Sequence, residues 1–260
     1  MSTVAKVFRI LEEVVSHQET GLSYSEVVQR TRLPKASAHR VLKSLLETGY
    51  LRFDPEAGRY FGDLKLCVLG AEVTSHFDLR RYIRPHLLQL HAETGHTCHL
   101  GVRSGRAGVY LDKIESASSF GFKLYSEIGK RFPLHCTAMG KVLLAAAGDA
   151  ERRQVLGARL PAFTPHTLTD ARRLERELRG VAARGYAVDR EEITRGLMCV
   201  AAPVRGREGE VVAATSVTFP AYLDKDRGIA REIRAVTRCG AAISAGLQGG
   251  ARASGGRRTA

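Results

Sequence analysis

The residue types best suited to chemistry gather first near the middle of the chain, in Gly129-Lys-Arg-Phe-Pro-Leu-His-Cys-Thr-Ala-Met-Gly-Lys141. Pro133 excludes a helix before the turn, whereas Thr137 is a good N-cap for the apolar run that follows. Gly140 allows the backbone a close approach. The first N–H groups of such a helix have no intrahelical partner and favour a negative ligand. The stretch predicts a small-anion site made by the backbone of Thr137, Ala138, Met139 and Gly140.

A second group of polar residues lies towards the C-terminus. Asp189 leaves one short predicted strand, and Cys199 begins the next. Ser216 and Thr218 are two residues apart in a further strand, so their side chains share one face of the sheet. Together with the turn at Thr137, these residues could line one pocket with polar ends.

The charged residues around this group have less specific roles. Asp189 has two readings that stay open, one as a pocket residue and one as a cap of its own loop. Glu191 and Glu192 are expected to lie in a solvated loop, and Lys141 is expected to be exposed one helical turn beyond the anion site. The anion contacts are therefore predicted to come mainly from the backbone.

A catalytic cysteine is a weaker interpretation. Cys199, His135 and Asp189 are the residue types of a cysteine hydrolase, but they lie in separate segments. A cysteine within Met-Cys-Val-Ala-Ala is more often a small core residue. We therefore expect no catalytic residue.

A metal site is also disfavoured. His96, Cys98 and His99 lie close in sequence, but alternation along a strand sends two of them to one face and the third to the other. No complete ligand set is visible. The sequence predicts no metal and no cofactor.

Short strand-like runs with helices on their flanks must position the C-terminal groups. This mixture predicts an α+β domain rather than a strictly alternating parallel sheet. Pro85 is expected in the first turn of the helix nearest the start of this domain. Strands are expected at 98–102, 108–114, 119–122, 186–188, 198–204 and 210–219, and helices at 83–93, 138–146, 172–184 and 226–247.

The N-terminal pattern predicts a winged helix-turn-helix. Apolar residues at helical spacing define a first helix over 4–15, and Ser23-Tyr-Ser-Glu26 has the form of a capping box for a second. Pro34 is well placed in the first turn of a third helix that stops at Gly49. Two short strands around Asp54–Gly58 then form a wing. The third helix would enter the major groove and the wing would touch the DNA backbone. The candidate DNA-binding residues are Lys35, Ser37, His39, Arg40, Lys43 and Arg59.

Length and composition agree with a DNA-binding protein without locating its surface. The chain has 260 residues and a net charge of +13, which favours polyanionic partners. Residues 1–65 nevertheless carry 10 Lys/Arg against 8 Asp/Glu. Five scattered cysteines without a C-x-x-C pair disfavour disulfides and structural zinc. With no apolar run of about 18 residues and no secretory signal, a reducing cytoplasm is the expected location.

Three segments, in this order, resemble the isocitrate lyase regulator (IclR) family of bacterial transcription factors. They are Leu33-Pro-Lys-Ala-Ser-Ala-His-Arg-Val-Leu-Lys-Ser-Leu with Gly49-Tyr-Leu, Gly129-Lys with Pro133-Leu-His-Cys-Thr-Ala-Met-Gly-Lys141, and Gly185-Tyr-Ala-Val-Asp-Arg-Glu-Glu with Gly196-Leu-Met-Cys-Val-Ala-Ala-Pro203. The resemblance covers roughly residues 3–248. It implies a DNA-binding domain over 1–63, a linker helix over 64–78, a GAF-like effector domain over 79–248 and a disordered tail over 249–260.

The same resemblance implies a function. The chain would be a regulator, most simply a repressor of a metabolic operon, that binds a palindromic operator as a dimer or tetramer. A small carboxylate effector would contact the turn at Thr137–Gly140 together with Asp189, Cys199, Ser216 and Thr218. The apolar walls of that pocket would come from Phe122, Leu124, Phe132, Leu197 and Met139. An activator of the same family is the first alternative, and an enzyme that uses the GAF-like pocket is the second.

Overall fold

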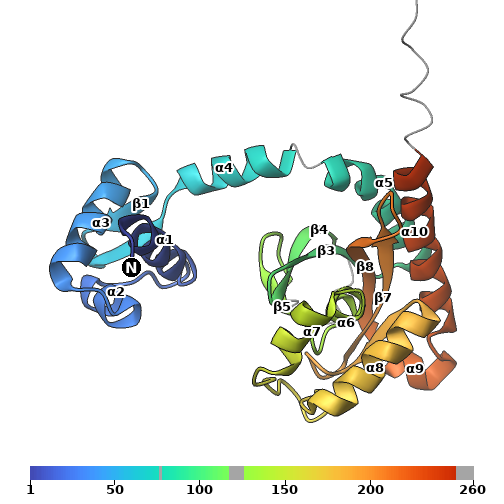
Figure 1. Cartoon of the computed structure of the whole chain (residues 1–260). Helices are drawn as coiled ribbons and strands as arrows, with labels where there is room; N and C mark the ends of the chain where they lie inside the picture. Colours follow the sequence, from blue (N-terminus) through green and yellow to red (C-terminus); the bar gives the residue numbers. More distant parts are fainter. Residues whose placement is uncertain (76–77, 117–125, 250–260) are drawn as a thin grey trace, which may run out of the picture. The chain divides into compact units, whose positions relative to one another are not determined.

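The computed structural model describes residues 1–75, 78–116 and 126–249. It divides into two compact units, Met1–Phe77 and Asp78–Ala260 (Figure 1). The strand expected at 119–122 and the tail beyond Gly249 lie outside the described residues. Among the helices that are described, none is long and apolar enough to cross a membrane.

The N-terminal unit has three helices, a two-stranded hairpin and a fourth helix. These are α1 (Thr3–Val15), α2 (Tyr24–Thr31), α3 (Lys35–Glu47), β1 (Leu51–Asp54), β2 (Arg59–Gly62) and α4 (Leu64–Ser75). The expected capping box is present: Ser23 accepts from the N–H of Glu26, whose carboxylate accepts from the N–H of Ser23. Pro34 is the N-cap of α3 rather than part of its first turn. The helix-turn-helix and the wing agree with the sequence prediction.

One apolar core holds the three N-terminal helices and the hairpin together. Its buried members come from the three helices and β1, and they include Ile10, Val14, Val27, Leu42 and Leu51; Tyr60 of β2 is partly buried against them. The wing joins the helices through a bridge between Leu22 and Tyr60. Because the inner face of α3 is used in this core, the opposite face of α3 is left to solvent.

The C-terminal unit is built on one six-stranded antiparallel sheet in the order β5-β4-β3-β8-β7-β6. The strands are β3 (Thr97–Ser104), β4 (Ala107–Ile114), β5 (Arg131–Pro133), β6 (Ala187–Arg190), β7 (Leu197–Arg205) and β8 (Val211–Pro220). The helices are α5 (Asp78–Thr94), α6 (Ala138–Ala145), α7 (Asp149–Leu156), α8 (Ala171–Arg184), α9 (Tyr222–Arg227) and α10 (Ala230–Gly249). The α+β prediction is confirmed.

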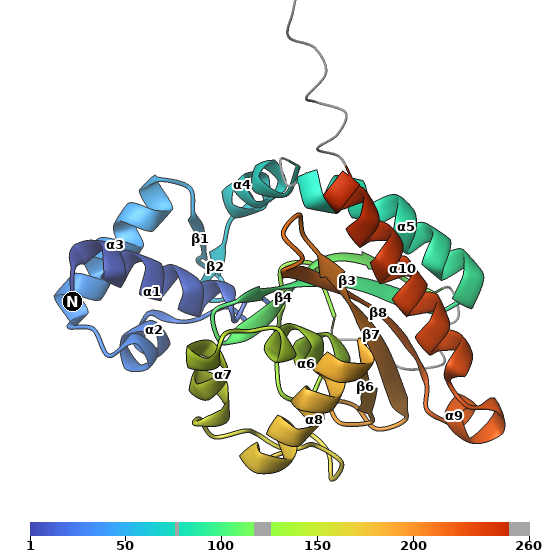
Figure 2. The same cartoon turned by 45° about the vertical axis from the view of Figure 1, so that its right-hand side comes forward.

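Helices cover both faces of this sheet, which explains why its strands are apolar almost throughout. Figure 2 shows α5 and α10 side by side along one face, and α6 and α8 across the other. Leu100, Val200 and Val217 point towards α5 and α10. Ala201 and Ala214, one residue out of phase, point towards α6 and α8. The strands therefore contribute side chains to two apolar cores, one on each face of the sheet.

A β-bulge in β4 changes which face its residues occupy. Leu100 pairs with Asp112, but the next residue of β3, Gly101, pairs with Tyr110, so Leu111 is the extra residue. Tyr110 and Asp112 consequently point to opposite faces although they are two residues apart. Tyr110 faces α6, while Asp112 is buried and accepts two hydrogen bonds from Arg84 of α5, at 2.6 and 2.8 Å.

Two helical predictions for this unit were wrong in detail, and a third helix was missed. The helix expected at 83–93 begins at Asp78, so Pro85 lies inside α5 rather than in its first turn. The single C-terminal helix is two helices, because Gly228 ends α9 with a φ of +68°. Helix α7 was not predicted, since its eight residues carry only one buried apolar side chain, Val155.

Candidate functional site

The exposed face of α3 carries the predicted DNA-binding side chains. Lys35, His39, Arg40 and Lys43 are exposed and Ser37 is half-buried. No side chain caps the helix at Pro34, so its positive N-terminal end remains open to an anion such as a phosphate. The face therefore combines a helix terminus, basic residues and hydrogen-bonding groups that suit a DNA groove.

Helix α2 braces the start of α3. The hydroxyl of Tyr24 donates to the carbonyl of Lys35 at 2.8 Å, and its ring lies edge-on to that of His39 at 6.4 Å. The tyrosine thus fixes the angle between the two helices where α3 would enter a groove. Nothing in the sequence pattern distinguished Tyr24 from an ordinary polar residue of α2.

Arg59 has an internal role in the wing. Its guanidinium donates to the carbonyl of Gly21 at 3.0 Å and to Glu26 at 3.2 Å, which ties the hairpin to the start of α2. The tip of the wing carries Asp54, whose carboxylate accepts from the N–H groups of Glu56 and Ala57. A DNA contact by Arg59 remains a prediction. It would use the guanidinium N–H groups that do not bond to Gly21 or Glu26.

The predicted anion turn is present at the start of α6. Thr137 is the N-cap, and its hydroxyl accepts from the N–H of Gly140 at 3.1 Å and donates to Pro133 at 2.7 Å. The N–H of Gly140 is therefore already used. The N–H groups of Ala138 and Met139 find no acceptor among the described residues, although both residues are buried. These two groups are the ones free to meet a ligand.

The predicted pocket residues of the sheet form one cross-strand row. Asp189 of β6 pairs with Cys199 of β7, which pairs with Thr218 of β8. The thiol of Cys199 and the hydroxyl of Thr218 are 3.1 Å apart. Ser216 lies one row further along β8, opposite His99 of β3. All of these side chains belong to the face of the sheet that α6 covers.

Asp189 is completely buried and uses only half of its carboxylate. Oδ1 accepts from the N–H of Glu192 at 2.7 Å, as expected of a loop cap. Oδ2 has no hydrogen-bond partner within the described part of the chain, as expected of a pocket residue. Burial raises the pKa of this carboxyl to about 7. Both readings of Asp189 are therefore supported by the geometry.

Tyr110, which the sequence did not single out, completes this face. It lies between Phe132, with ring centroids 4.6 Å apart, and His99, at 5.3 Å. Phe132 covers the strands so closely that a side chain at Gly108 would meet its ring at 2.1 Å. Burial lowers the pKa of His99 to about 3, so its ring is neutral. The inward position of Tyr110 depends on the bulge, for which the sequence carries no simple signal.

The remaining apolar residues of the predicted pocket are only partly placed. Met139 and Phe132 both lie over Gly101 of β3, where a Cβ would come within 3.3 Å of each side chain. Leu197 is buried at the start of β7. Phe122 and Leu124 lie outside the described residues.

Comparison with known proteins follows the same division into two units. Residues 3–55 match the IclR helix-turn-helix domain, and residues 71–245 match the bacterial transcriptional regulator IclR C-terminal family. The chain belongs to the IclR family. It is a DNA-binding transcriptional regulator.

Several relatives of this IclR-family regulator match over most of their length. The HTH-type transcriptional regulator XynR of Escherichia coli is 36% identical over 95% of this chain and 97% of its own. KdgR of Dickeya chrysanthemi is 37% identical over 85% of this chain and 71% of its own.

Solved structures give the same result. The IclR of Thermotoga maritima has a TM-score of 0.70 and 32% identity, covering 95% of this chain and 98% of its own. An IclR homologue from Microbacterium hydrocarbonoxydans, complexed with 4-hydroxybenzoate, has a TM-score of 0.80 and 25% identity, covering 95% and 100% of the two chains. Such relatives are transcriptional regulators and not enzymes.

Two predictions about charged residues of the IclR-family regulator were wrong. Lys141 is buried, with 1% of its surface exposed, and Glu192 is buried as well. The ammonium of Lys141 donates to Glu192 Oε1 and to the carbonyl of Val188, both at 2.5 Å. A counter-ion from a distant loop makes the burial possible, and the sequence pattern of α6 could not reveal that partner.

In the described part of the chain, the histidines considered for catalysis and metal binding contact other groups. His135 bonds to the carbonyl of Pro161 at 3.0 Å rather than to Cys199, and burial raises the pKa of the Cys199 thiol. His96 faces Glu232 at 3.3 Å. Among the described residues, no group of three or more His, Cys, Asp and Glu side chains could hold a metal ion.

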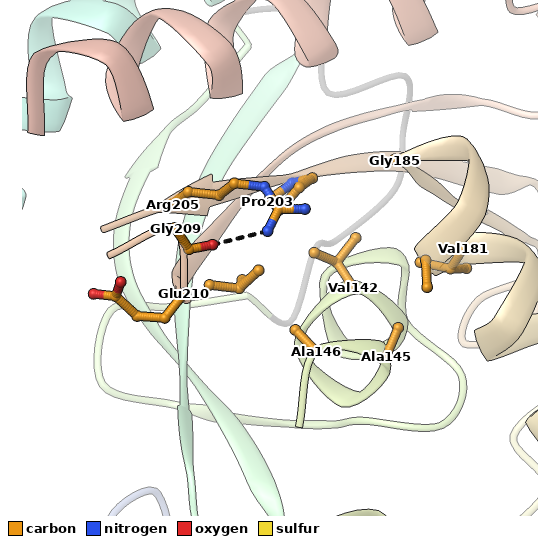
Figure 3. A pocket seen from close by; sticks show the side chains of 11 residues that line it. Val142, Ala145, Ala146, Val181, Gly185, Pro203, Arg205, Gly209 and Glu210 are labelled. Atoms are coloured by element: carbon orange, nitrogen blue, oxygen red, sulfur yellow. Dashed lines mark hydrogen bonds between the residues drawn. The ribbon is translucent and has the colours of Figure 1, made fainter. Parts of the chain in front are cut away.

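A cavity of about 300 Å³ opens at the other end of α6 in this regulator (Figure 3). Its walls are small apolar side chains of α6 and α8, with Arg205 and Glu210 from the hairpin between β7 and β8. Arg205 donates to the carbonyl of Gly209 at 2.9 Å across the rim. The cavity contains none of the predicted effector residues.

Proposed function

We propose that this regulator represses a metabolic operon by binding its operator through α3, and that a small carboxylate bound in the C-terminal unit changes its operator affinity. The observation that carries the ligand site is the start of α6, where the N–H groups of two buried residues, Ala138 and Met139, have no acceptor among the described residues. The positive end of the helix dipole favours a carboxylate there.

In the proposed DNA complex, α3 lies in the major groove. Arg40 and His39 contact base edges, since both are exposed on the outer face of the helix and arginine recognises guanine with two hydrogen bonds. Lys35, Ser37 and Lys43 contact phosphates. Arg59 contributes from the wing with whichever N–H groups its bonds to Gly21 and Glu26 leave available.

The proposed ligand is a hydroxy acid or a hydrated oxo acid. Its carboxylate would meet the N–H groups at the start of α6, and the hydroxyls of Ser216 and Thr218 would meet other ligand oxygens. Oδ2 of Asp189 has no described partner, so it suits a hydroxyl donor and repels a second bare carboxylate when ionised. The complex of the Microbacterium homologue with 4-hydroxybenzoate, which is a hydroxylated carboxylate, supports this class.

Calorimetry with lactate, glycolate, glyoxylate, pyruvate and acetate tests the proposed site. We expect the hydroxy acids and hydrated glyoxylate to bind more tightly than acetate. Ser216→Ala should weaken the binding of the tightest ligand about fivefold, since one lost hydrogen bond is worth about 1 kcal/mol. Ser244→Ala, in α10 on the opposite side of the sheet, is the matched control. If both Ser216→Ala and Asp189→Ala leave every affinity unchanged, the pocket lies elsewhere.

Ligand binding must favour one arrangement of the DNA-binding units to change transcription. A coupling of about 1–3 kcal/mol between ligand and operator is typical. Gel-shift titrations with and without the tightest ligand measure this coupling. A promoter fusion then separates the proposed repressor from an activator, because deletion of a repressor gene raises expression whereas deletion of an activator gene lowers it.

We propose a dimer as the smallest active unit, since one recognition helix reads too few base pairs to select an operator in a genome. Exposed apolar side chains support pairing through the N-terminal unit: Val4 and Phe8 on α1, and Leu64, Val68 and Leu69 on α4. We expect Val68→Glu/Leu69→Glu to shift the full chain towards monomer in light scattering and to weaken operator binding. Leu88→Glu, an exposed leucine of α5, is the control. A wild-type monomer bound tightly to a single half-site would contradict the proposal.

A further inference from the structure

Lys141 is the most deeply buried cationic side chain next to the proposed ligand site. It follows Gly140 in α6, and its ammonium lies 2.5 Å from Glu192 Oε1, 2.5 Å from the carbonyl of Val188 and 3.8 Å from Glu177. Its ammonium therefore donates two hydrogen bonds, and Glu177 adds only an ion pair. The side chain joins the first turn of α6 to the edge strand β6 and to the loop that follows it.

That loop is held in one conformation by several bonds. Besides its bond to Lys141, Glu192 has its N–H bound by Asp189 at 2.7 Å and its carbonyl bound by Thr167 at 2.6 Å. Thr164 donates to the carbonyl of Glu191 at 2.7 Å. Glu191 itself has a φ of +60°, which is a strained conformation for a residue with a side chain. Strain of this kind persists only where surrounding contacts over-determine the backbone.

A buried ion pair is a poor way to add stability. Desolvation of the two charges offsets most of their attraction, and apolar residues of similar volume often give a folded protein of equal or greater stability. The Lys141–Glu192 pair is therefore better explained by what it positions. The N–H of Glu192 donates to Asp189, whose Oδ2 has no partner among the described residues and belongs to the proposed ligand site.

We infer that Lys141 and Glu192 are positioning residues of the ligand site: they hold Asp189 in place beside the start of α6 and determine at what pH it is charged. The effect on ligand binding rests on the proposed function. The contacts among Lys141, Glu192 and Asp189 do not, because they are present without a ligand. The charge of the Asp189 carboxylate that contacts the ligand would then depend on Lys141 of α6.

Groups from four elements face Asp189. They are Glu192 in its own loop, Lys141 of α6, Cys136 just before α6, Cys199 of β7 and Tyr110 of β4. Burial raises the pKa of both thiols and of the phenol, so these three are neutral at pH 7. Glu192 and Lys141 are left as the charged neighbours within the described ranges.

The two charged neighbours act in opposite directions. The pKa of Asp189 is raised to about 7, mainly by burial; the charge of Glu192 contributes to this rise and Lys141 opposes it. Without Lys141, Asp189 loses the neighbouring positive charge and holds its proton to higher pH. Without the charge of Glu192, Asp189 faces the ammonium alone and loses its proton at lower pH.

The test is a titration of the Asp189 carboxyl carbon by NMR in the full chain, labelled with ¹³C-aspartate, without ligand. Asp189→Asn identifies the resonance. We expect the midpoint to rise by about one pH unit in Lys141→Met and to fall by about one unit in Glu192→Gln. Lys141→Arg should keep the wild-type midpoint, because the charge is kept. Arg179→Met, which removes an exposed ion pair with Glu175, is the control and should change nothing.

A purely structural role gives a different result. If the pair only packs the loop, its removal admits water, and both single variants should move the midpoint down towards the ordinary range of an aspartate. The double variant Lys141→Met/Glu192→Gln distinguishes the electrostatic role from the purely structural one even if Lys141→Met alone does not fold. If the two charges act in opposite directions, the midpoint of the double variant should return close to the wild-type value. If the substitutions only loosen the packing of the loop, its midpoint should be lower than that of either single variant. Downward shifts in all three variants, or no shift in any, would overturn the inference.

Calorimetry with lactate separates this inference from the proposed function. The charge of Asp189 changes at its midpoint, so the affinity for lactate should change over the same pH range. That pH range should lie higher in Lys141→Met and lower in Glu192→Gln. If neither lactate nor any other tested carboxylate binds the wild type, the proposed ligand site is wrong, while the NMR midpoints still decide the roles of Lys141 and Glu192.

Discussion

Arg40→Ala is expected to weaken operator binding by about 1–3 kcal/mol and to relax the base preference at one position of each half-site. Arg40 is exposed on the outer face of α3, while the neighbouring Val41 and Leu42 are buried in the core. The substitution therefore leaves the helix in place, and alanine favours the helix. Gel-shift titrations against the operator and against single-base variants measure both effects.

Lys43→Ala is the matched comparison on the same helix. Lys43 is exposed and lies 3.8 Å from Glu47, which is also exposed, so the loss of this pair has little effect on stability. We expect Lys43→Ala to weaken binding to all sequences alike and to reduce the salt dependence by about one phosphate contact. If Arg40→Ala instead behaves like Lys43→Ala, or changes nothing, α3 does not read the bases through Arg40.

Local signals in the sequence were sufficient for the N-terminal unit. Ser23 and Glu26 three residues apart, Pro34 at the start of α3 and Gly49 just after its end each mark a boundary by their own conformational preference. The core then follows from helical periodicity. Two contacts were not predictable: that of Arg59 with Glu26, which lies 33 residues away in sequence, and that of Tyr24 with the carbonyl of Lys35.

The part of the C-terminal site that one turn forms was predictable from the sequence. The parts that depend on contacts between distant segments were not. Thr137 carries its own capping signal, and the structure places it at the N-terminus of α6. Tyr110 could not be found, since period-two alternation would send it to the same face as Asp112 until the bulge at Leu111 is known. Lys141 looked like a surface lysine because its counter-ion, Glu192, is 51 residues away.

The backbone packs tightly in the proposed ligand site at Gly140, and a substitution there should have a large effect. A Cβ there would lie 2.6 Å from Leu134 Cα, 2.6 Å from the carbonyl oxygen of Pro133 and 2.5 Å from the hydroxyl of Thr137. Two of these atoms belong to the backbone and cannot rotate away. The start of α6 must therefore shift, and the N-cap bond from the N–H of Gly140 to Thr137 must lengthen or break.

Gly140→Ala is expected to lower the free energy of unfolding by about 1–3 kcal/mol, as other overpacked substitutions do, and to weaken carboxylate binding at least tenfold. Glycine to alanine within a helix is ordinarily stabilising by about 0.5–1 kcal/mol, so the sign of the change already distinguishes the close contact from helix propensity. Gly70→Ala, within α4, is the control, since an added Cβ there meets no atom within 4 Å. Urea unfolding and calorimetry with the tightest carboxylate measure the two effects. A stabilised Gly140→Ala protein with unchanged ligand affinity would mean that the turn at Thr137 tolerates movement and that the carboxylate does not depend on it.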